Sequence, residues 1–157
     1  MMEPCPACGA ALGGREGCGR AFEELGLRRF SDVRYARWSR VTIDAYSLQH
    51  PDEYMRSAKS FAAHLTGAAA AIERAGDAER VNDLVVRWLS TSPALVRPVA
   101  PAPRQRGGLT IADVLGVDDP ANAIPAWTRS AWQAYAPLHA TARAWIALAT
   151  RERVAVR

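Results

Sequence analysis

The sequence has almost no lysine, and its positive charge is not clustered. Lys59 is the only lysine among 157 residues, so the net charge of +4 rests on arginines that mostly alternate with aspartate and glutamate. The nearest approaches to a basic face are Arg34, Arg37 and Arg40, at helical spacing, and the loop at 104–106. A nucleic-acid binder presents a clustered basic face or a recognisable docking helix. We therefore interpret these arginines as a solvated surface and expect no nucleic-acid partner.

Long apolar runs and familiar catalytic motifs are also missing. No apolar run approaches the length of a membrane span, and the opening Met-Met-Glu-Pro has neither the basic nor the apolar segment of a secretory signal. The chain has no GxxxxGKS/T, no GxGxxG after a strand, no HExxH and no GxSxG. These absences argue against nucleotide-loop enzymes, zincin proteases and α/β-hydrolases. They also predict a cytoplasmic protein without a membrane partner.

Cysteine is scarce, but all three cysteines lie within the first eighteen residues. Cys5 and Cys8 form a C-x2-C pair followed by Gly9, and Cys18 follows a glycine-rich turn. Such a pair can place two thiolates on one ion, and zinc prefers four tetrahedral nitrogen or sulfur ligands. His50, at a break between two predicted helices, is the leading fourth ligand. We therefore predict zinc as the cofactor, bound by Cys5, Cys8, Cys18 and His50.

Other interpretations of the three thiols fit the sequence less well. A disulfide would leave one thiol unpaired and needs an oxidising compartment. A thioredoxin-like redox pair lies at a strand-to-helix turn, and the sequence has no convincing strand. An iron–sulfur cluster held by three cysteines and one histidine stays open, as does iron or cobalt in place of zinc.

Apolar residues recur at helical spacing along most of the chain. With 49% apolar and 23% charged residues, the composition is that of a single globular domain over 1–157. The predicted fold is all-α, a four- or five-helix bundle with an N-terminal zinc-knuckle extension. Its expected segments are a knuckle (1–17), four helices within 18–90 (18–27, 32–48, 51–76 and 78–89), a Pro/Gly-rich loop (91–108) and C-terminal helices (109–150).

Local signals set these boundaries. We expect one helix to begin after an N-cap at Asp32, another to begin at Pro51, and a short helical turn to begin after a cap at Thr110. The last long helix should begin at Pro120 or Pro125, with a kink or a new start at Pro137. Cys18 would lie in the first turn of its helix. The helix dipole favours a thiolate at that position.

Two further histidines lie on or beside apolar helical stripes. His139 belongs to the stripe of the last helix and His64 lies beside that of helix 51–76. A lone histidine on such a face is usually a hydrogen-bonded core residue. Because facing helices of a bundle share core layers, His64 and His139 are also candidate catalytic residues, as an acid/base pair or with His50 in a second metal site that activates water. We predict a binding cleft lined by these two histidines with Tyr46, Gln49, Trp132, Tyr135 and Arg143.

Four motifs span nearly the whole chain. They are Cys-Pro-x-Cys-Gly at 5–9, Tyr-x-Leu-Gln-His-Pro at 46–51, Ser-x-x-x-His-Leu at 60–65, and Trp-x-x-Tyr-x-x-Leu-His-x-x-x-Arg-x-Trp at 132–145. In this combination the chain resembles a family of small bacterial proteins of unknown function. The resemblance implies that all three histidines belong to the family's pattern, and it transfers no activity.

Two function classes follow. The first is a non-catalytic zinc-binding or accessory module, in which four protein ligands close a structural site and the partner is an unknown protein or small molecule. The alternative is a small metal-dependent enzyme that uses His64 and His139 for hydrolytic or transfer chemistry on a small molecule. We favour the first class, because small bundles without a recognisable catalytic motif are more often binders.

Overall fold

The computed structural model describes residues 2–152, and the regular structure within them is helical. The elements are α1 (Gly14–Ser31), α2 (Val33–Ala36), α3 (Ser39–Gln49), α4 (Pro51–Tyr54), α5 (Ala58–Glu73), α6 (Ala78–Ser90), η1 (Ile111–Asp113), α7 (Pro120–Ala134), η2 (Ala136–Leu138) and α8 (His139–Thr150). Pairing between extended segments is limited, in this part of the chain, to one antiparallel bridge between Pro4 and Ala11. The predicted all-α fold with an N-terminal cysteine-rich extension is confirmed.

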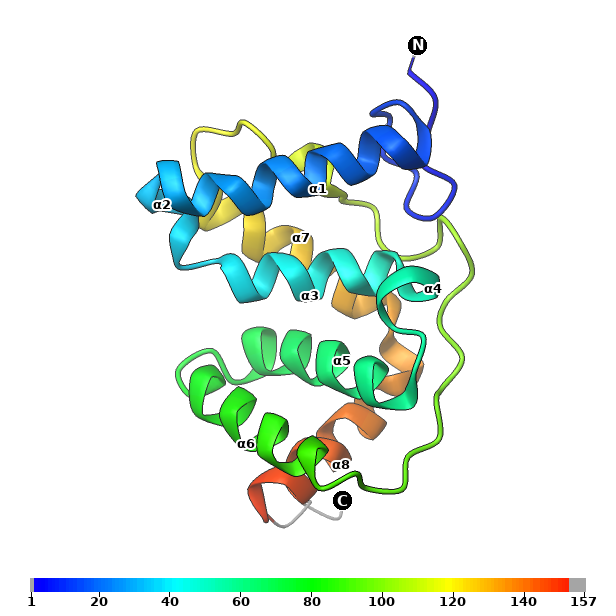
Figure 1. Ribbon diagram of the computed structural model, residues 1–157, viewed down its shortest axis with the longest axis vertical. Helices are drawn as coiled ribbons and strands as arrows, with labels where there is room; N and C mark the ends of the chain where they lie inside the picture. The colour runs from blue at the N-terminus through cyan, green and yellow to red at the C-terminus, as the bar shows by residue number, and fades with distance from the viewer. Residues whose placement is uncertain (1, 153–157) are drawn as a thin grey trace.

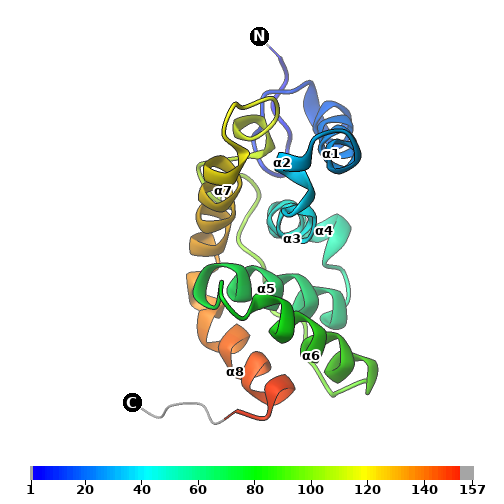
Figure 2. The ribbon, with the colours of Figure 1, turned by 90° about the vertical axis from the view of Figure 1, so that its left-hand side faces the viewer.

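The helices form successive layers along the long axis of the molecule (Figure 1). α1 and α2 lie at one end, α3 follows beside α7, and α5, α6 and α8 form the other end. Turned by 90°, the molecule shows α7 on one side and α1 and α3 on the other (Figure 2). The loop at 91–108 runs along one edge from the end of α6 back to the N-terminal segment. Within 2–152, no helix is both long and apolar enough to cross a membrane.

Two hydrophobic cores divide this stack. The first, called here the knuckle core, contains the three cysteines and side chains of α1, α2, α3, η1 and the first half of α7, the largest being Tyr35, Tyr46, Ile111, Ile124 and Trp127. The second, called the bundle core, is built mainly by α5, α6, α8 and the second half of α7, with Phe61, Leu65, Val85, Trp132 and Ile146 among its members. Because α7 contributes to both cores, it ties the two ends of the molecule together.

The first helix begins earlier than the sequence predicts. α1 starts at Gly14 instead of residue 18. The N–H groups of Gly13 and Gly14 donate to the carbonyl of Glu3 at 3.1 and 2.7 Å, with φ angles of 97° and 70° that glycine adopts without strain. Cys18 consequently lies in the second turn of α1. The expected first-turn effect of the helix dipole on its thiol is therefore wrong, since that effect fades within one turn.

Two other predicted helices are each divided in the structure. Asp32 does cap a helix, by accepting from the Arg34 N–H, but α2 ends at Ala36 and a separate α3 begins at Ser39. Pro51 does start a helix, but α4 has only four residues. α5 then begins after a capping box formed by Ser57 and Ser60. The sequence-based prediction lacks this helix start because the apolar stripe continues across the break.

The remaining boundaries agree with the sequence-based expectation. α6 spans Ala78–Ser90, Thr110 accepts from the Ala112 N–H at the start of η1, and α7 begins at Pro120. Pro137 lies in η2, the short 3-10 segment between α7 and α8. The break occurs there because proline lacks the N–H that a continuing helix needs.

Candidate metal centre

Four side chains from three parts of the chain meet in the knuckle core. Cys5 and Cys8 belong to the N-terminal segment, Cys18 to α1, and His50 is the residue between α3 and α4. One ligand atom from each residue lies within 4.8 Å of the other three, and all four residues are buried. Cys18 Sγ is 3.5 Å and Cys5 Sγ is 3.7 Å from His50 Nε2, and Cys8 Sγ is 3.8 Å from Cys18 Sγ. This cluster could hold one metal ion.

A glycine turn brings the first two cysteines together. Gly9 has a φ angle of 86°, which favours glycine, and its N–H donates to the carbonyl of Cys5 at 2.8 Å. The Cys5 N–H donates to the Ala10 carbonyl at 2.8 Å, which closes the turn. The Ala10 N–H points at the Cys8 sulfur, 3.5 Å away. A backbone donor of this kind favours the thiolate form that a metal ligand requires.

The orientation of His50 is set by the end of α3. Its Nδ1 lies 2.8 Å from the Tyr46 carbonyl oxygen, which can only accept a hydrogen bond. The proton of a neutral ring is therefore on Nδ1, and the lone pair of Nε2 faces the cysteines. Metal-bound histidines are commonly oriented by a hydrogen bond of this type. The second ring nitrogen is thus prepared as a ligand by local helix geometry.

The cysteine cluster already favours a thiolate without any metal charge. The hydrogen bond between the Cys8 and Cys18 thiols, in which either sulfur can donate, lowers the pKa of Cys18 and raises that of Cys8. Burial raises the pKa of Tyr46, so its hydroxyl stays protonated and can donate to Cys18 Sγ at 3.5 Å. These contacts favour negative charge in a buried place, where an unpaired anion is unfavourable. A bound cation would relieve that penalty.

An aromatic stack connects the cluster to the surface of the molecule. The rings of Tyr46 and His50 are 3.8 Å apart with an 18° interplanar angle, and Phe22 stacks on the other face of Tyr46 at 3.9 Å and 4°. Tyr54 meets both Phe22 and Tyr46 edge-on at 5.7 Å. The stack therefore fixes α1, α3 and α4 against one another around His50.

Arg106 is a supporting residue that the sequence did not single out. It is buried, and its Nη1 donates to the carbonyls of Ala7 (3.4 Å) and Gln49 (3.2 Å), each adjacent in sequence to a cluster residue. Its Nε donates to the Pro101 carbonyl at 3.0 Å. One guanidinium thus joins the loop, the N-terminal segment and the end of α3. A sequence signal for this role is lacking, because the contact with Ala7 spans 99 residues.

The predicted binding cleft is not assembled by these side chains. Four of the five residues named with the histidines are buried core residues: Tyr46, Gln49, Trp132 and Tyr135. Gln49 donates to the carbonyls of Arg106 and Leu109 and accepts from Trp127 Nε1. Arg143 is a surface residue that pairs with Glu73 at 2.6 Å. The aromatic residues among them are buried because an aromatic stripe at helical spacing marks the buried face of a helix.

The structure gives His64 and His139 separate partners. His64 Nδ1 lies 2.9 Å from the buried carboxylate of Asp44, whose second oxygen accepts from Arg40. His139 Nε2 lies 2.8 Å from the Trp132 carbonyl, and its ring stacks on the Trp132 indole at 3.8 Å. Neither histidine belongs to the cysteine cluster. Each therefore has the internal hydrogen bond expected of a histidine that supports helix packing.

Fold and site together define an all-α protein with a buried cluster of three cysteines and one histidine. The chain belongs to the family of unknown function DUF5946, which matches residues 3–136. This range includes all four residues of the cluster and ends before His139. No curated protein matches the chain, and no solved structure matches it.

Proposed function

We propose that this protein is a zinc-binding accessory module, in which Cys5, Cys8, Cys18 and His50 hold one structural zinc ion. The observation that carries the proposal is the spacing of the ligand atoms. In a tetrahedral zinc site with bonds of about 2.3 Å to sulfur and about 2.0–2.1 Å to nitrogen, sulfurs lie about 3.8 Å apart and sulfur lies about 3.6 Å from nitrogen. Three of the six separations, 3.8, 3.5 and 3.7 Å, match these edges, and all four atoms lie within 4.8 Å of one another.

The donor set supports zinc over other occupants. Three thiolates and one imidazole are soft and borderline ligands, which select zinc over magnesium or calcium. The four ligands of an iron–sulfur cluster are spread over two or more iron atoms, so some of them lie farther apart than the edges of one tetrahedron. Thiols that serve as metal ligands must stay reduced, and this is the basis for proposing a cytoplasmic location.

A site with four protein ligands has no open position for water or substrate, so the proposed role of the metal is structural. The ion would join the N-terminal segment, α1 and the start of α4, and would thereby set the shape of one end of the molecule. Function is then binding of a partner instead of catalysis. The alternative of an enzyme using His64 and His139 is not carried forward, because each is engaged in its own internal contact.

The test is metal analysis of untagged protein, with His50→Ala beside wild type and His139→Ala as the matched control. We expect about one zinc per wild-type and His139→Ala chain and a large loss in His50→Ala. Substitution with Co²⁺ should give the intense visible bands of a tetrahedral thiolate site. Full zinc retention in His50→Ala would remove His50 from the site, and a wild-type protein without bound metal would overturn the proposal.

A further inference from the structure

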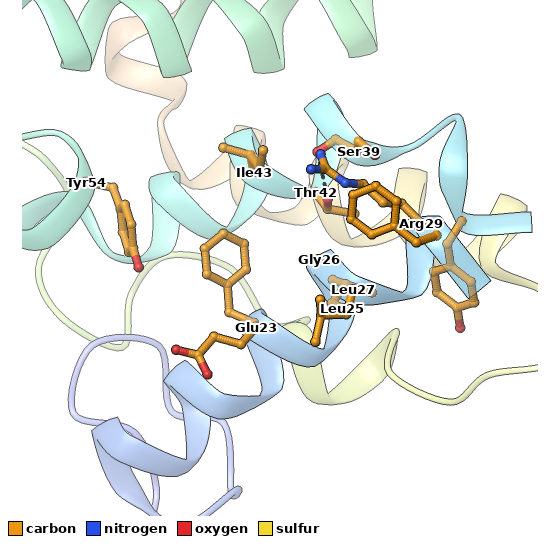
Figure 3. A pocket seen from close by; sticks show the side chains of 12 residues that line it. Glu23, Leu25, Gly26, Leu27, Arg29, Ser39, Thr42, Ile43 and Tyr54 are labelled. Carbon is orange, nitrogen blue, oxygen red and sulfur yellow. Dashed lines mark hydrogen bonds between the residues drawn. The ribbon is translucent and has the colours of Figure 1, made fainter. Parts of the chain in front are cut away.

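Large apolar side chains are exposed in and just after the C-terminal half of α1. Leu27 is 66% and Phe30 76% exposed, and Val33, just after α1, is 85% exposed. Leu27 and Phe30 line a groove of about 580 Å³ between α1 and α3 (Figure 3). Contiguous exposed apolar surface on a small protein usually marks an interaction site.

The groove has a shape that suits a large ring. Tyr54 lines one end, Ile43 lines the α3 side, and Gly26 lies on the α1 side. Phe22 also lines the groove, with its ring edge-on to Tyr54 at 5.7 Å. A Cβ atom at Gly26 would meet no atom within 4 Å, so this glycine leaves open space on the helix surface. Phe22 stacks on Tyr46, and this contact holds the Phe22 side of the groove in place.

The groove also has opposite charges at its two ends. Glu23 lies at the end near Tyr54, and Arg29 lies at the end near Ser39 (Figure 3). Neither Glu23 nor Arg29 forms an ion pair among the residues that the structure describes. The Arg29 guanidinium lies over the Phe30 ring, 4.5 Å from its centroid. Six residues of α-helix separate the two charges by about 9 Å along the axis.

We propose that this groove is the docking site for a second copy of the chain, with the two α1 helices antiparallel about a two-fold axis near Gly26 and Leu27. Phe30 of each copy enters the other's groove, and Glu23 of each copy faces Arg29 of the other. A second copy is the occupant that fits because one surface carries both the projecting ring and the recess. Its charges also become complementary when the helix is reversed, as a two-fold interface requires. The proposal does not depend on which metal is bound.

A pair of glycine substitutions on one helix provides the sharpest test. Gly26→Glu should be accommodated by the monomer, because the space beside Gly26 is open, but it places a charged side chain in the groove. Gly19→Glu is the matched control, since Gly19 is also open at its Cβ position and does not line the groove. Sedimentation equilibrium of the metal-loaded full chain over a dilution series should show dimers for wild type and Gly19→Glu and monomers for Gly26→Glu.

Charge reversal provides a second, independent readout. Glu23→Arg or Arg29→Glu alone should weaken dimerisation at least about tenfold, because like charges then face each other, and the double reversal should restore most of the affinity. Helical content by circular dichroism verifies that each variant folds. A wild-type chain that stays monomeric at all concentrations would overturn the proposal and leave the groove to another partner. A dimer that tolerates Gly26→Glu would equally overturn it.

Discussion

The two cores of this protein are built by different means. In the bundle core, α6 buries Val81, Val85 and Leu89 along one stripe, and α5 buries Phe61 and Leu65 against it. In the knuckle core, α1 is the longest helix described, yet its buried residues are two glycines with Cys18, Ala21 and Leu25. α1 therefore has little apolar area with which to hold itself in place, since stabilisation by burial scales with apolar area.

The difference indicates what each core depends on. Helices with a continuous apolar stripe are held by packing, which needs no ligand. α1 is held instead where Cys18 meets the other cysteines and His50, and where Phe22 stacks on Tyr46. Under the proposed function, the metal supplies for the knuckle core what side-chain burial supplies for the bundle core. The following predictions test that contrast.

Metal removal should produce the largest effect, and it should be confined to one core. Structural zinc in small domains contributes on the order of 10 kcal/mol of binding free energy that is also folding free energy. After chelation, we expect amides of α1 to exchange with solvent much faster, whereas amides of α5, α6 and α8 keep their protection. Hydrogen–deuterium exchange with and without chelator measures both regions in one experiment.

Re-addition of zinc to the chelated protein is the control, and it should restore the protection of α1. A Cys18→Ser variant should resemble the chelated wild type. If α1 stayed protected without metal, or if α5 and α6 lost protection equally, the proposed division of labour between the cores would be wrong.

A cavity in the bundle core should have the opposite pattern. Leu65 is fully buried on α5, so Leu65→Ala should lower the free energy of unfolding by about 2–5 kcal/mol. The zinc content of the folded protein should not change, because Leu65 lies in the other core. Leu148→Ala, at an exposed position on α8, is the control and should change stability by less than about 0.5 kcal/mol. Loss of metal in the folded Leu65→Ala protein would show that the cores are not separable.

Arg106→Met should have an intermediate effect, because Arg106 connects the loop to the knuckle core. The change removes this donor from the carbonyls of Ala7, Gln49 and Pro101, although Ala7 keeps the Arg104 N–H. A buried polar group without its partner destabilises by about 1–3 kcal/mol. We expect a lower melting temperature and weaker zinc retention in a competition with chelator. Arg104→Met, at an exposed position of the same loop, should leave both quantities unchanged. An equal effect of the two substitutions would remove the special role of Arg106.

Sequence reasoning identified the four clustered residues because their chemistry is local and specific. A C-x2-C pair followed by glycine can be recognised without any knowledge of long-range contacts. His50 is recognisable from its position at a break between two predicted helices, and the structure places it with the three cysteines. The division of the predicted helices at α2 and α4 was missed, because an apolar stripe continues across a short break. Arg106 was missed because its partners are distant in sequence. Four residues of the predicted cleft are buried in the structure, because the aromatic residues of a helical core and those of a binding site have the same spacing.

The smallest predicted effect concerns ion pairs at the far end of the bundle core. Glu152 accepts from Arg74 at 2.8 Å and lies 3.3 Å from Arg80, which joins the end of α8 to the α5–α6 turn. The Arg74 guanidinium holds the pKa of Glu152 below its ordinary value of 4.5. A carboxylate with a depressed pKa stabilises the fold above that ordinary value and loses its contribution as the pH falls through the lowered value.

Because Glu152 is partly exposed and screened by solvent, we expect Glu152→Gln to destabilise the protein at pH 7 by less than about 1 kcal/mol. The difference between Glu152→Gln and wild type should shrink in acid, as the wild-type carboxylate is protonated, and also in high salt. Thermal unfolding at pH 7 and in acid, at low and high salt, measures this difference. An effect as large as that of Leu65→Ala would contradict the contrast between the two cores. It would mean that the bundle core depends on surface ion pairs and not mainly on apolar packing.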